Sequence, residues 1–321
     1  MELYCQHFTL DIPNLPAMKK LIILFCVWAS ILSCTNKSDE LYKQGIALLN
    51  ANDYTPAIAK FDSAILLNDK NIDAYFNRGN AKFDTGDYQG CLADYDKAVS
   101  LSSATNLTPI VFFNRGDAYR LLENYDEALK DYTKAIDMRS DYDSAFVCRG
   151  LTYLAMGDLV NAQADFDKSL PMNAKNASAY YGIGEVNYEQ KNYIKAIEFY
   201  TKAIDLRPDH EFYYIDRGDT YYLIEKFEQA IADYTKAIQL DPENPKVYVA
   251  RGDALDDGGN AQGAIADYDK AIELNPDYAS AYYNRGITRK NTGDKNGACE
   301  DFNKAVELGS ESAVKSAEAC N

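Results

Sequence analysis

The side chains most often used in catalysis are scarce in this sequence. Histidine occurs only as His7 and His210, which excludes a site built from several imidazoles and leaves little material for histidine-dependent acid–base chemistry. No nucleophile and base stand at a suggestive spacing. Gly182-Ile183-Gly184 lies in a helical pattern and not in a phosphate-binding loop. We therefore expect a non-catalytic protein with no cofactor and no metal site.

Three carboxylates form the most distinctive polar group: Asp253, Asp256 and Asp257, just before Gly258-Gly259. Carboxylates at the C-terminal end of a helix face the negative end of its dipole, which is unfavourable unless a cation or basic group compensates. Their spacing does not match the alternating acids of a calcium-binding loop. One interpretation is a site for a basic partner, and the other is a solvated acidic surface.

The overall charge restricts the class of partner. The 321 residues include 33 Lys and Arg against 49 Asp and Glu, which gives a net charge of -16. Such a chain repels the phosphate backbone that supplies most of the affinity in nucleic-acid binding. We therefore expect no nucleic-acid partner.

Two of the seven cysteines are placed to form a disulfide. Cys299 and Cys320 lie equally far before and after a turn at Gly309-Ser310, so antiparallel helices would bring them side by side. The bond would fasten a C-terminal cap, residues 313–321, over the end of the preceding helices. Cys91 is expected in the core and Cys148 as an unpaired thiol.

A glycine recurs along the chain and defines a repeat. Its spacings are 34, 37, 34, 34, 34, 34 and 34 residues, so eight units cover residues 38–312 with one three-residue insertion. If this glycine is repeat position 8, position 20 is Ala or Cys and position 24 is always Phe or Tyr. The glycines are Gly45, Gly79, Gly116, Gly150, Gly184, Gly218, Gly252 and Gly286.

Each unit reads as two helices joined by a turn. Positions 4, 8 and 11 share one helical face, as do positions 20, 24 and 27, and breakers such as Gly86-Asp87 separate them at positions 15 and 16. Small residues at 8 and 20 let the two backbones approach, and the aromatic ring at 24 is expected to fill the space toward the neighbouring unit. Pro208, Pro242 and Pro276 end the second helices of their units.

A 34-residue period with Gly, Ala, aromatic, Ala and Pro at these offsets resembles the tetratricopeptide repeat. The resemblance implies an all-α fold: a right-handed α-solenoid of eight helix-turn-helix repeats, closed here by the C-terminal capping helix. It also implies that stacking supplies the core, because one hairpin cannot bury its own apolar face.

A charge pair recurs within the units. Position 7 is Arg and position 23 is Asp in the same six units, and the two units without the Arg also lack the Asp. Antiparallel packing places these positions opposite each other, so we expect exposed ion pairs that fix helix register and contribute about 0–1 kcal/mol each. The alternative is a ladder of arginines that binds carboxylates. The predicted pairs are Arg78 with Asp94, Arg115 with Asp131, Arg149 with Asp165, Arg217 with Asp233, Arg251 with Asp267 and Arg285 with Asp301.

By the same resemblance, first-helix positions 2, 5, 9, 12 and 13 line a concave surface. The residues there are aromatic and acidic, which favours a basic or extended peptide, or a sugar that stacks on the rings. The alternative is that the rings only pack between units and the acids only solvate the surface. The candidate partner-binding residues are Phe76, Asn80, Phe113, Asp117, Tyr181, Glu185, Tyr188, Asp219, Tyr222, Asp253, Asp256 and Asp257.

The N-terminal segment differs from the repeats. Lys19-Lys20 precede an apolar run over residues 21–32, which is too short to span a bilayer. The sequence Ile31-Leu32-Ser33-Cys34 at its end resembles the signal of bacterial lipoproteins. The resemblance implies a signal peptide at 18–33, lipidation of Cys34, a tether at 34–37, and an upstream extension or misassigned start at 1–17. A plain signal peptide or a buried helix is the alternative.

Together these features predict an interaction scaffold, anchored by lipid in a bacterial cell envelope, at the outer membrane or facing the periplasm. Its partner would be a protein or peptide of basic or aromatic character, and its only membrane contact would be the lipid. The alternative function is a glycan-binding lipoprotein of a polysaccharide-uptake system.

Overall fold

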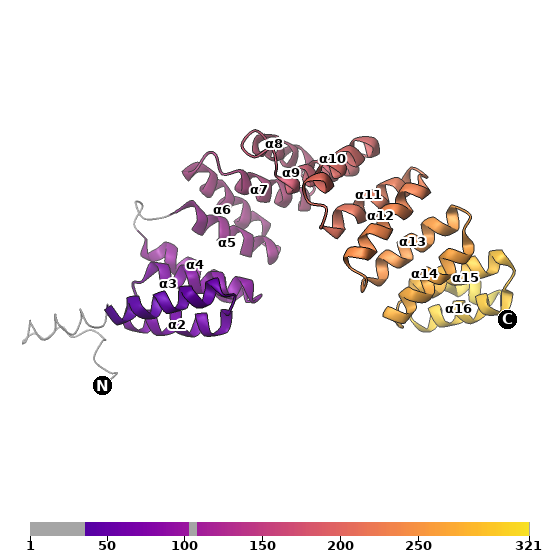
Figure 1. Cartoon of the computed structure of the whole chain (residues 1–321), viewed down its shortest axis with the longest axis horizontal. Helices are drawn as coiled ribbons and strands as arrows, with labels where there is room; N and C mark the ends of the chain where they lie inside the picture. The colour runs from indigo at the N-terminus through magenta and orange to yellow at the C-terminus, as the bar shows by residue number, and fades with distance from the viewer. Residues whose placement is uncertain (1–35, 103–107, 321) are drawn as a thin grey trace, which may run out of the picture. The chain divides into compact units, whose positions relative to one another are not determined.

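The computed structural model describes residues 36–102 and 108–320 (Figure 1). These residues form helices joined by turns, with no strand among them. The extension, the signal peptide and the lipidation site predicted at 1–17, 18–33 and Cys34 lie outside the described residues. Within the described residues, no helix is both long and apolar enough to cross a membrane.

The chain divides into two compact units, Met1–Thr152 and Tyr153–Asn321. The first contains a helix over residues 36–50, then α2 (Tyr54–Leu67), α3 (Ile72–Asp84), α4 (Tyr88–Leu101), α5 (Pro109–Leu121), α6 (Tyr125–Met138) and the start of α7 (Asp143–Ala155). The second continues with α8 (Leu159–Ser169), α9 (Ala177–Glu189), α10 (Tyr193–Leu206), α11 (Glu211–Leu223), α12 (Phe227–Leu240), α13 (Pro245–Asp257), α14 (Ala261–Leu274), α15 (Ala279–Thr292), α16 (Lys295–Glu307), a 3₁₀ turn (Glu311–Ala313) and α17 (Val314–Glu318).

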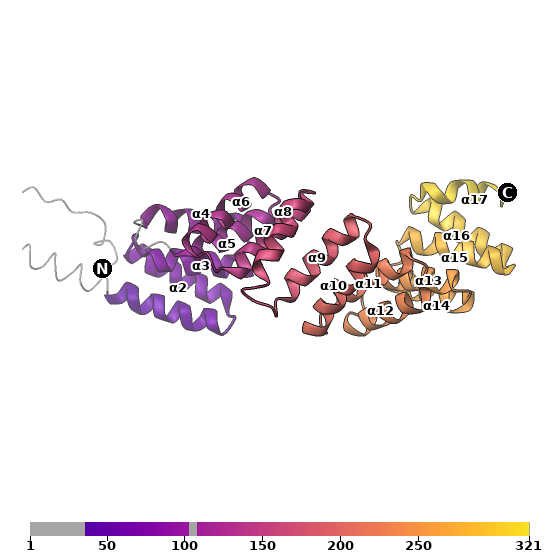
Figure 2. The ribbon, with the colours of Figure 1, turned by 90° about the horizontal axis from the view of Figure 1, so that it is seen from above.

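Consecutive helices pair as the repeat predicts. The closest packing joins α3 with α4, α5 with α6, α9 with α10, α11 with α12, α13 with α14, and α15 with α16 (Figure 2). The second helices α2, α4, α8, α10, α12 and α14 also pack on the first helices that follow them, α3, α5, α9, α11, α13 and α15. The architecture is therefore an α-solenoid of helix-turn-helix hairpins. The helices α10, α12 and α14 end two residues before the prolines that the sequence analysis identified.

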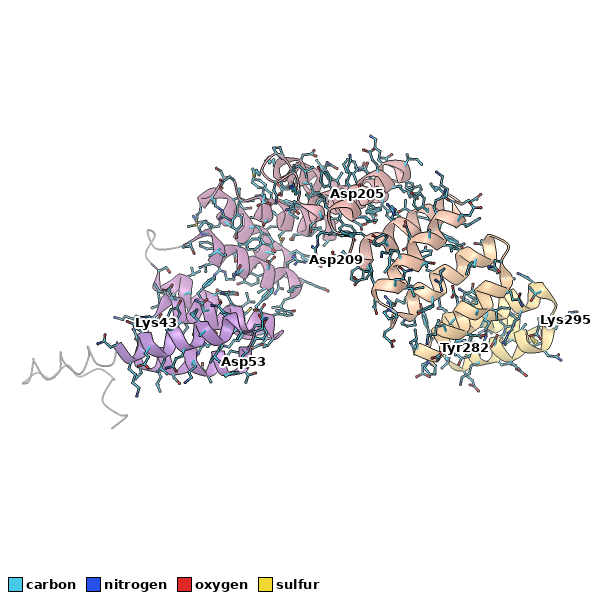
Figure 3. All side chains as sticks on the ribbon, viewed as in Figure 1. Lys43, Asp53, Asp205, Asp209, Tyr282 and Lys295 are labelled. Carbon is cyan, nitrogen blue, oxygen red and sulfur yellow. A yellow bond between two sulfur atoms is a disulfide. The ribbon has the colours of Figure 1, made fainter. Side chains whose placement is uncertain are left out.

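Every hairpin turns through the same backbone conformation. The residue at position 15 has a positive φ in all eight repeats, although only four of the eight are glycine. The side chain at position 16 often caps the second helix, as where Asp87 Oδ1 accepts a hydrogen bond from Gly90 N at 2.9 Å. Figure 3 labels Lys43 on the first helix and Asp53 in the turn after it. The position-15 residues are Asn52, Gly86, Glu123, Gly157, Lys191, Glu225, Gly259 and Gly293.

The repeat glycine is required by the ring at position 24 of its own hairpin. A Cβ on Gly218 would stand 2.8 Å from the Tyr234 ring, and a Cβ on Gly252 would stand 2.6 Å from the Tyr268 ring. The expectation that this ring serves mainly to fill space toward the neighbouring unit was thus incomplete, because the ring occupies the place of the missing side chain. A Cβ on Gly182, in the following repeat, would overlap the Phe166 ring.

Five of the six predicted ion pairs are present in the described structure, and they are more buried than predicted. In Arg251–Asp267, Nε and Nη2 each bond one carboxylate oxygen at 2.7 Å. The carboxylates are not exposed, since the Asp267 side chain is only 10% accessible. The free energy of about 0–1 kcal/mol expected for an exposed pair therefore does not apply, because removing one partner would leave a buried, unpaired charge. The sixth predicted pair stays a prediction, because Arg149 lies in the first compact unit of the chain and Asp165 in the second.

The third guanidinium nitrogen binds the preceding repeat. Each arginine's Nη1 reaches the side chain at position 25 of the repeat before it, as with Arg251 Nη1 and Thr235 Oγ1 at 3.0 Å. The arginines therefore connect adjacent repeats as well as the two helices of one repeat, and they are not free to form a carboxylate-binding ladder. The position-25 partners are Asp62, Asp96, Thr133, Thr201, Thr235 and Asp269.

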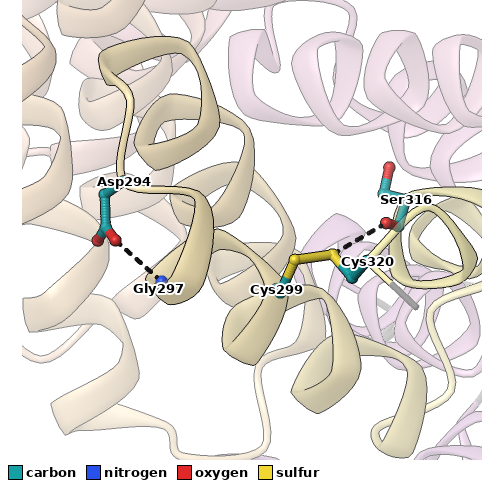
Figure 4. The surroundings of a disulfide bond; sticks show 5 residues. All are labelled: Asp294, Gly297, Cys299, Ser316 and Cys320. Carbon is teal, nitrogen blue, oxygen red and sulfur yellow. Dashed lines mark hydrogen bonds between the residues drawn. A yellow bond between two sulfur atoms is a disulfide. The ribbon is translucent and has the colours of Figure 1, made fainter.

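The C-terminal cap is fastened to the last repeat. Cys299 of α16 and Cys320, just after α17, form a disulfide with their Cα atoms 5.7 Å apart (Figure 4). Ala317 of α17 packs against Ala298 and Phe302. The cap consists of the 3₁₀ turn and a five-residue helix, shorter than the single helix expected.

Candidate partner-binding site

The acidic group at the end of α13 lines a cavity. This cavity measures about 250 Å³ and is bounded by residues of α11, α13, α14 and α15. Its walls carry three carboxylates, two phenols, an amide and one aliphatic side chain. They are Asp253, Asp256, Asp257, Tyr222, Tyr268, Asn284 and Ile287.

Neutral donors hold all three carboxylates. Asp253 Oδ1 accepts from Tyr268 Oη at 2.7 Å and from Asn284 Nδ2 at 2.8 Å. Asp256 Oδ2 accepts from Thr288 Oγ1 at 2.9 Å, and Asp257 Oδ2 from Tyr222 Oη at 2.5 Å. These bonds orient the carboxylates without neutralising them, and burial raises the pKa of Asp253. The cavity can therefore receive positive charge.

A second cavity lies in the first unit. It measures about 360 Å³ and is lined by Leu49, Asn80, Phe83, Asp84, Tyr95, Asn114 and Asp117. Asn80 Oδ1 accepts from Tyr95 Oη at 2.8 Å and from Asn114 Nδ2 at 2.9 Å. This cavity has two carboxylates, Asp84 and Asp117, and two amides, whereas the cavity at α13 has three carboxylates and one amide. Burial raises the pKa of Asp84 and of Asp117, as it does for Asp253.

The polar residue at position 9 has a structural partner in each repeat that contains one. The buried tyrosine at position 24 donates to it: Tyr95 to Asn80, Tyr132 to Asp117, Tyr200 to Glu185, Tyr234 to Asp219 and Tyr268 to Asp253. The three repeats with Phe at position 24 have Ile46, Leu151 and Ile287 at position 9. Each of these position-9 residues therefore satisfies a buried hydroxyl, and a role for them in partner binding stays a prediction.

The aromatic residues at position 5 also pack within their repeats. The Phe76 ring lies 5.9 Å from the Tyr95 ring and the Phe113 ring 6.0 Å from the Tyr132 ring, centroid to centroid. Neither Phe76 nor Phe113 lines a described cavity. The alternative given for the sequence, in which the rings serve packing, fits these two residues best.

Tyr181, Glu185, Tyr188 and Asp219 gather on α9 and α11 away from both cavities. Tyr181 stacks on Tyr213 at 5.0 Å, and Tyr188 packs edge-on against Tyr193 at 5.8 Å. Asp216, which the sequence analysis did not select, joins this group by accepting a hydrogen bond from Tyr181 Oη at 2.9 Å.

The sequence analysis missed the contribution of position 6. Asn114, Asp216 and Asn284 all stand there and face the preceding repeat. A signal existed, because position 6 is polar in five of the eight repeats: Lys43, Asn77, Asn114, Asp216 and Asn284. In residues 36–102 and 108–320, no three His, Cys, Asp or Glu side chains are arranged to hold a metal ion.

Comparison with known families decides the classification. Models described as tetratricopeptide or TPR repeat match residues 71–141, 177–210, 218–257, 252–293 and 279–308, which together make up more than half of the chain. The chain belongs to the tetratricopeptide repeat family. A search of curated proteins gave no match.

Solved structures of tetratricopeptide repeat proteins share the fold. A protein from Parabacteroides merdae has a TM-score of 0.62 and 23% identity, over 79% of this chain and 99% of that one. PilF of Pseudomonas aeruginosa has a TM-score of 0.58 and 20% identity, over 66% and 97%. YrrB, described as a TPR protein with an unusual peptide-binding site, has a TM-score of 0.53 and 23% identity, over 59% and 97%. At these identities the likeness concerns the fold. Tetratricopeptide repeats are protein-interaction scaffolds, and this chain is one by its family.

Proposed function

We propose that this scaffold binds a protein or peptide partner through a basic side chain that enters the cavity at the end of α13. The observation that carries the proposal is the group of three carboxylates, Asp253, Asp256 and Asp257, each oriented by neutral donors. The negative end of the α13 dipole adds to their charge. A guanidinium or ammonium group would compensate both, and the partly exposed Tyr222 ring lines the same cavity.

The choice of a basic partner follows from the electrostatic balance of the cavity. A hydrogen bond between an ionised donor and a carboxylate is about twice as strong as a neutral one. No Lys or Arg lines the cavity in the described structure. An acidic or neutral ligand would add repulsion or leave the carboxylates uncompensated. The aromatic character predicted for the partner rests on the half-buried rings of Tyr222 and Tyr188, and it is secondary to charge.

Peptides of matched length would test this proposal. Fluorescent decapeptides with Arg, Lys, Gln or Glu at two fixed positions would be titrated into the purified full-length chain, and binding followed by fluorescence polarisation. We expect the Arg and Lys peptides to bind and the Gln and Glu peptides not to bind. The affinity should fall as salt is raised, because screening weakens charge pairing.

A triple variant locates the binding. Asp253→Asn, Asp256→Asn and Asp257→Asn together should weaken the Arg peptide at least about tenfold, which corresponds to about 1.4 kcal/mol. The matched control changes three exposed carboxylates by the same charge, Asp137→Asn, Asp205→Asn and Asp209→Asn, of which the last two are labelled in Figure 3. Equal losses in both variants would show a net-charge effect and would count against the cavity. Retention of the chain on polysaccharide beads, with no basic peptide bound, would support the glycan alternative.

We also propose that the scaffold is tethered to a bacterial envelope through lipid on Cys34. The support is the sequence Ile31-Leu32-Ser33-Cys34 after a basic and apolar leader. Cells fed a radiolabelled fatty acid should incorporate label into the wild-type chain, and Cys34→Ala should abolish it. Unlabelled wild-type chain in the soluble fraction would reject the tether without affecting the peptide proposal.

A further inference from the structure

Some neighbouring repeats meet through a polar contact between position 9 of one and position 6 of the next. At two such junctions an amide donor faces an oxygen acceptor. Asn114 Nδ2 donates to Asn80 Oδ1 at 2.9 Å, and Asn284 Nδ2 donates to Asp253 Oδ1 at 2.8 Å. Each contact joins two first helices and also includes the hydroxyl of a buried tyrosine.

One junction places two acids where the others place a donor and an acceptor. Between α9 and α11, position 9 is Glu185 and position 6 is Asp216. Ionised carboxylates only accept hydrogen bonds, so this pair cannot bond directly unless one member is protonated. A carboxylic acid at this place supplies the donor that asparagine supplies elsewhere.

The groups around the pair do not compensate its charge. From α9, Tyr181 Oη donates to Asp216 Oδ2 at 2.9 Å. From α10, Tyr200 Oη donates to Glu185 Oε1. Two further acids add negative charge near the pair: Asp219 on α11, which accepts from Tyr234 Oη of α12 at 2.7 Å, and Glu189 on α9.

The neighbouring cation on α11 is already engaged. Arg217 bonds both oxygens of Asp233, at 2.8 and 2.7 Å, and Thr201 Oγ1 at 2.9 Å. In the described part of the chain, the carboxylates of Glu185 and Asp216 therefore accept their hydrogen bonds from phenols.

Proton affinity follows from this environment. Burial, and then the charge of Glu185, raises the pKa of Asp216 to about 7, with a further rise from Asp219 and an opposing effect from the Tyr181 hydrogen bond. Burial also raises the pKa of Glu185. A raised pKa means that the folded state binds the proton more tightly than the unfolded state. The stabilisation is thus present at acid pH and is lost as pH rises through the folded-state value.

We propose that the junction between α9 and α11 is a proton-dependent contact: one proton held by Glu185 and Asp216 joins the two repeats, and its loss near neutral pH loosens them. The consequence is a solenoid whose sixth repeat opens more easily at pH 8 than at pH 6. This contact lies away from the cavity at α13, and its test involves no ligand. The proton proposal can therefore fail while the peptide proposal stands, and the peptide proposal can fail while the proton proposal stands.

Hydrogen exchange of the full-length chain in mild detergent measures the effect directly. Exchange of α9 and α11 amides would be followed between pH 5.5 and 8.5 and corrected for the intrinsic pH dependence of exchange. One linked proton changes an opening constant by up to about tenfold per pH unit. We expect a rise of up to about 30-fold between pH 5.5 and 8.5, of which about 15-fold occurs below pH 7, with a plateau near pH 8. Asp216→Asn, which restores the amide of the other junctions, should remove the dependence.

A gain-of-function variant completes the test. Asn284→Asp creates an acid pair with Asp253 at the junction of α13 and α15, and it should give α13 and α15 the same pH dependence. Asp205→Asn, at an exposed site, should change nothing. A side-chain carboxyl titration of Asp216 by ¹³C NMR should show a midpoint well above the ordinary range. The proposal is overturned if wild type and Asp216→Asn show the same pH profile, or if Asp216 titrates with a pKa near 4.

Discussion

The bond between Tyr234 and Asp219 offers a stringent test of how the repeats are built. Tyr234 is 1% exposed, and its hydroxyl lies 2.7 Å from Asp219 Oδ1. Three other repeats replace the pair of tyrosine and polar residue by Phe and an aliphatic residue. The double change Tyr234→Phe with Asp219→Leu should therefore replace the hydrogen-bonded pair by the apolar pair. Each single change instead leaves one polar group without its partner.

The magnitudes follow from burial. Tyr234→Phe removes one hydrogen bond to a partly buried carboxylate and should cost about 1–2 kcal/mol. Asp219→Leu leaves the Tyr234 hydroxyl without its acceptor, at about 1–3 kcal/mol, offset in part by about 1 kcal/mol of added apolar burial. The double variant should lie within about 1 kcal/mol of wild type. A coupling energy of about 2 kcal/mol results.

Urea unfolding followed by far-UV circular dichroism would measure all four proteins. The midpoint shifts give the free-energy differences, provided that the slope m is unchanged. The reverse exchange in the first repeat, Ile46→Asp with Phe61→Tyr, is the matched control and should show coupling of the same sign. Additive single changes in both repeats would refute the reasoning, because the two positions would then act independently.

Three further outcomes are expected. Arg251→Met should destabilise the chain by about 2–4 kcal/mol by leaving the Asp267 charge buried, and Arg251→Met with Asp267→Leu should recover most of the loss in urea unfolding; no recovery would contradict the buried-pair argument. Glu225→Gly should raise stability by about 0.5–1 kcal/mol, because a φ of 59° strains any residue with a Cβ; a lower unfolding midpoint would contradict it. Reduction of Cys299–Cys320, whose sequence separation is 21, should cost the last repeat about 3 kcal/mol and accelerate hydrogen exchange in α17; unchanged exchange there would show that packing alone holds the cap.

Much of the hairpin architecture could be predicted because it depends on local periodicity. The glycine at position 8 and the aromatic at position 24 mark the two helical faces, and the breakers near position 15 mark the turn. Sequence spacing also placed Arg251 opposite Asp267, since an antiparallel hairpin fixes which positions face each other. Disulfide geometry at Cys299 and Cys320 follows from the same symmetry about a turn.

Contacts between repeats were harder to predict, because periodicity shows which face a residue occupies and not which neighbour it meets. The third bond of Arg251 goes to Thr235 of the preceding repeat, and the hairpin pattern contains no information on that stacking. The burial of the position-23 aspartates was also underestimated, because a charged residue is expected to be exposed unless its partners are known. In the sequence, positions 9 and 24 change together: a polar residue accompanies Tyr, and an aliphatic residue accompanies Phe. The structure gives the reason, because the buried Tyr234 hydroxyl donates its hydrogen bond to Asp219.

The arginine bond to the preceding repeat gives the array a direction. The side chain at position 25 of a repeat accepts a hydrogen bond from the arginine at position 7 of the next repeat. A repeat that is followed by such an arginine therefore depends on its C-terminal neighbour for this partner. The eighth repeat has no such neighbour, and Asn303, an uncharged side chain, stands there. Shortening the chain from its C-terminal end in steps of one repeat would uncover Asp269 first and Thr235 next, so the loss per step should depend on which side chain is left behind. Trimming from the N-terminal end would instead leave an arginine short of one acceptor, and the two series of truncated proteins should not be mirror images.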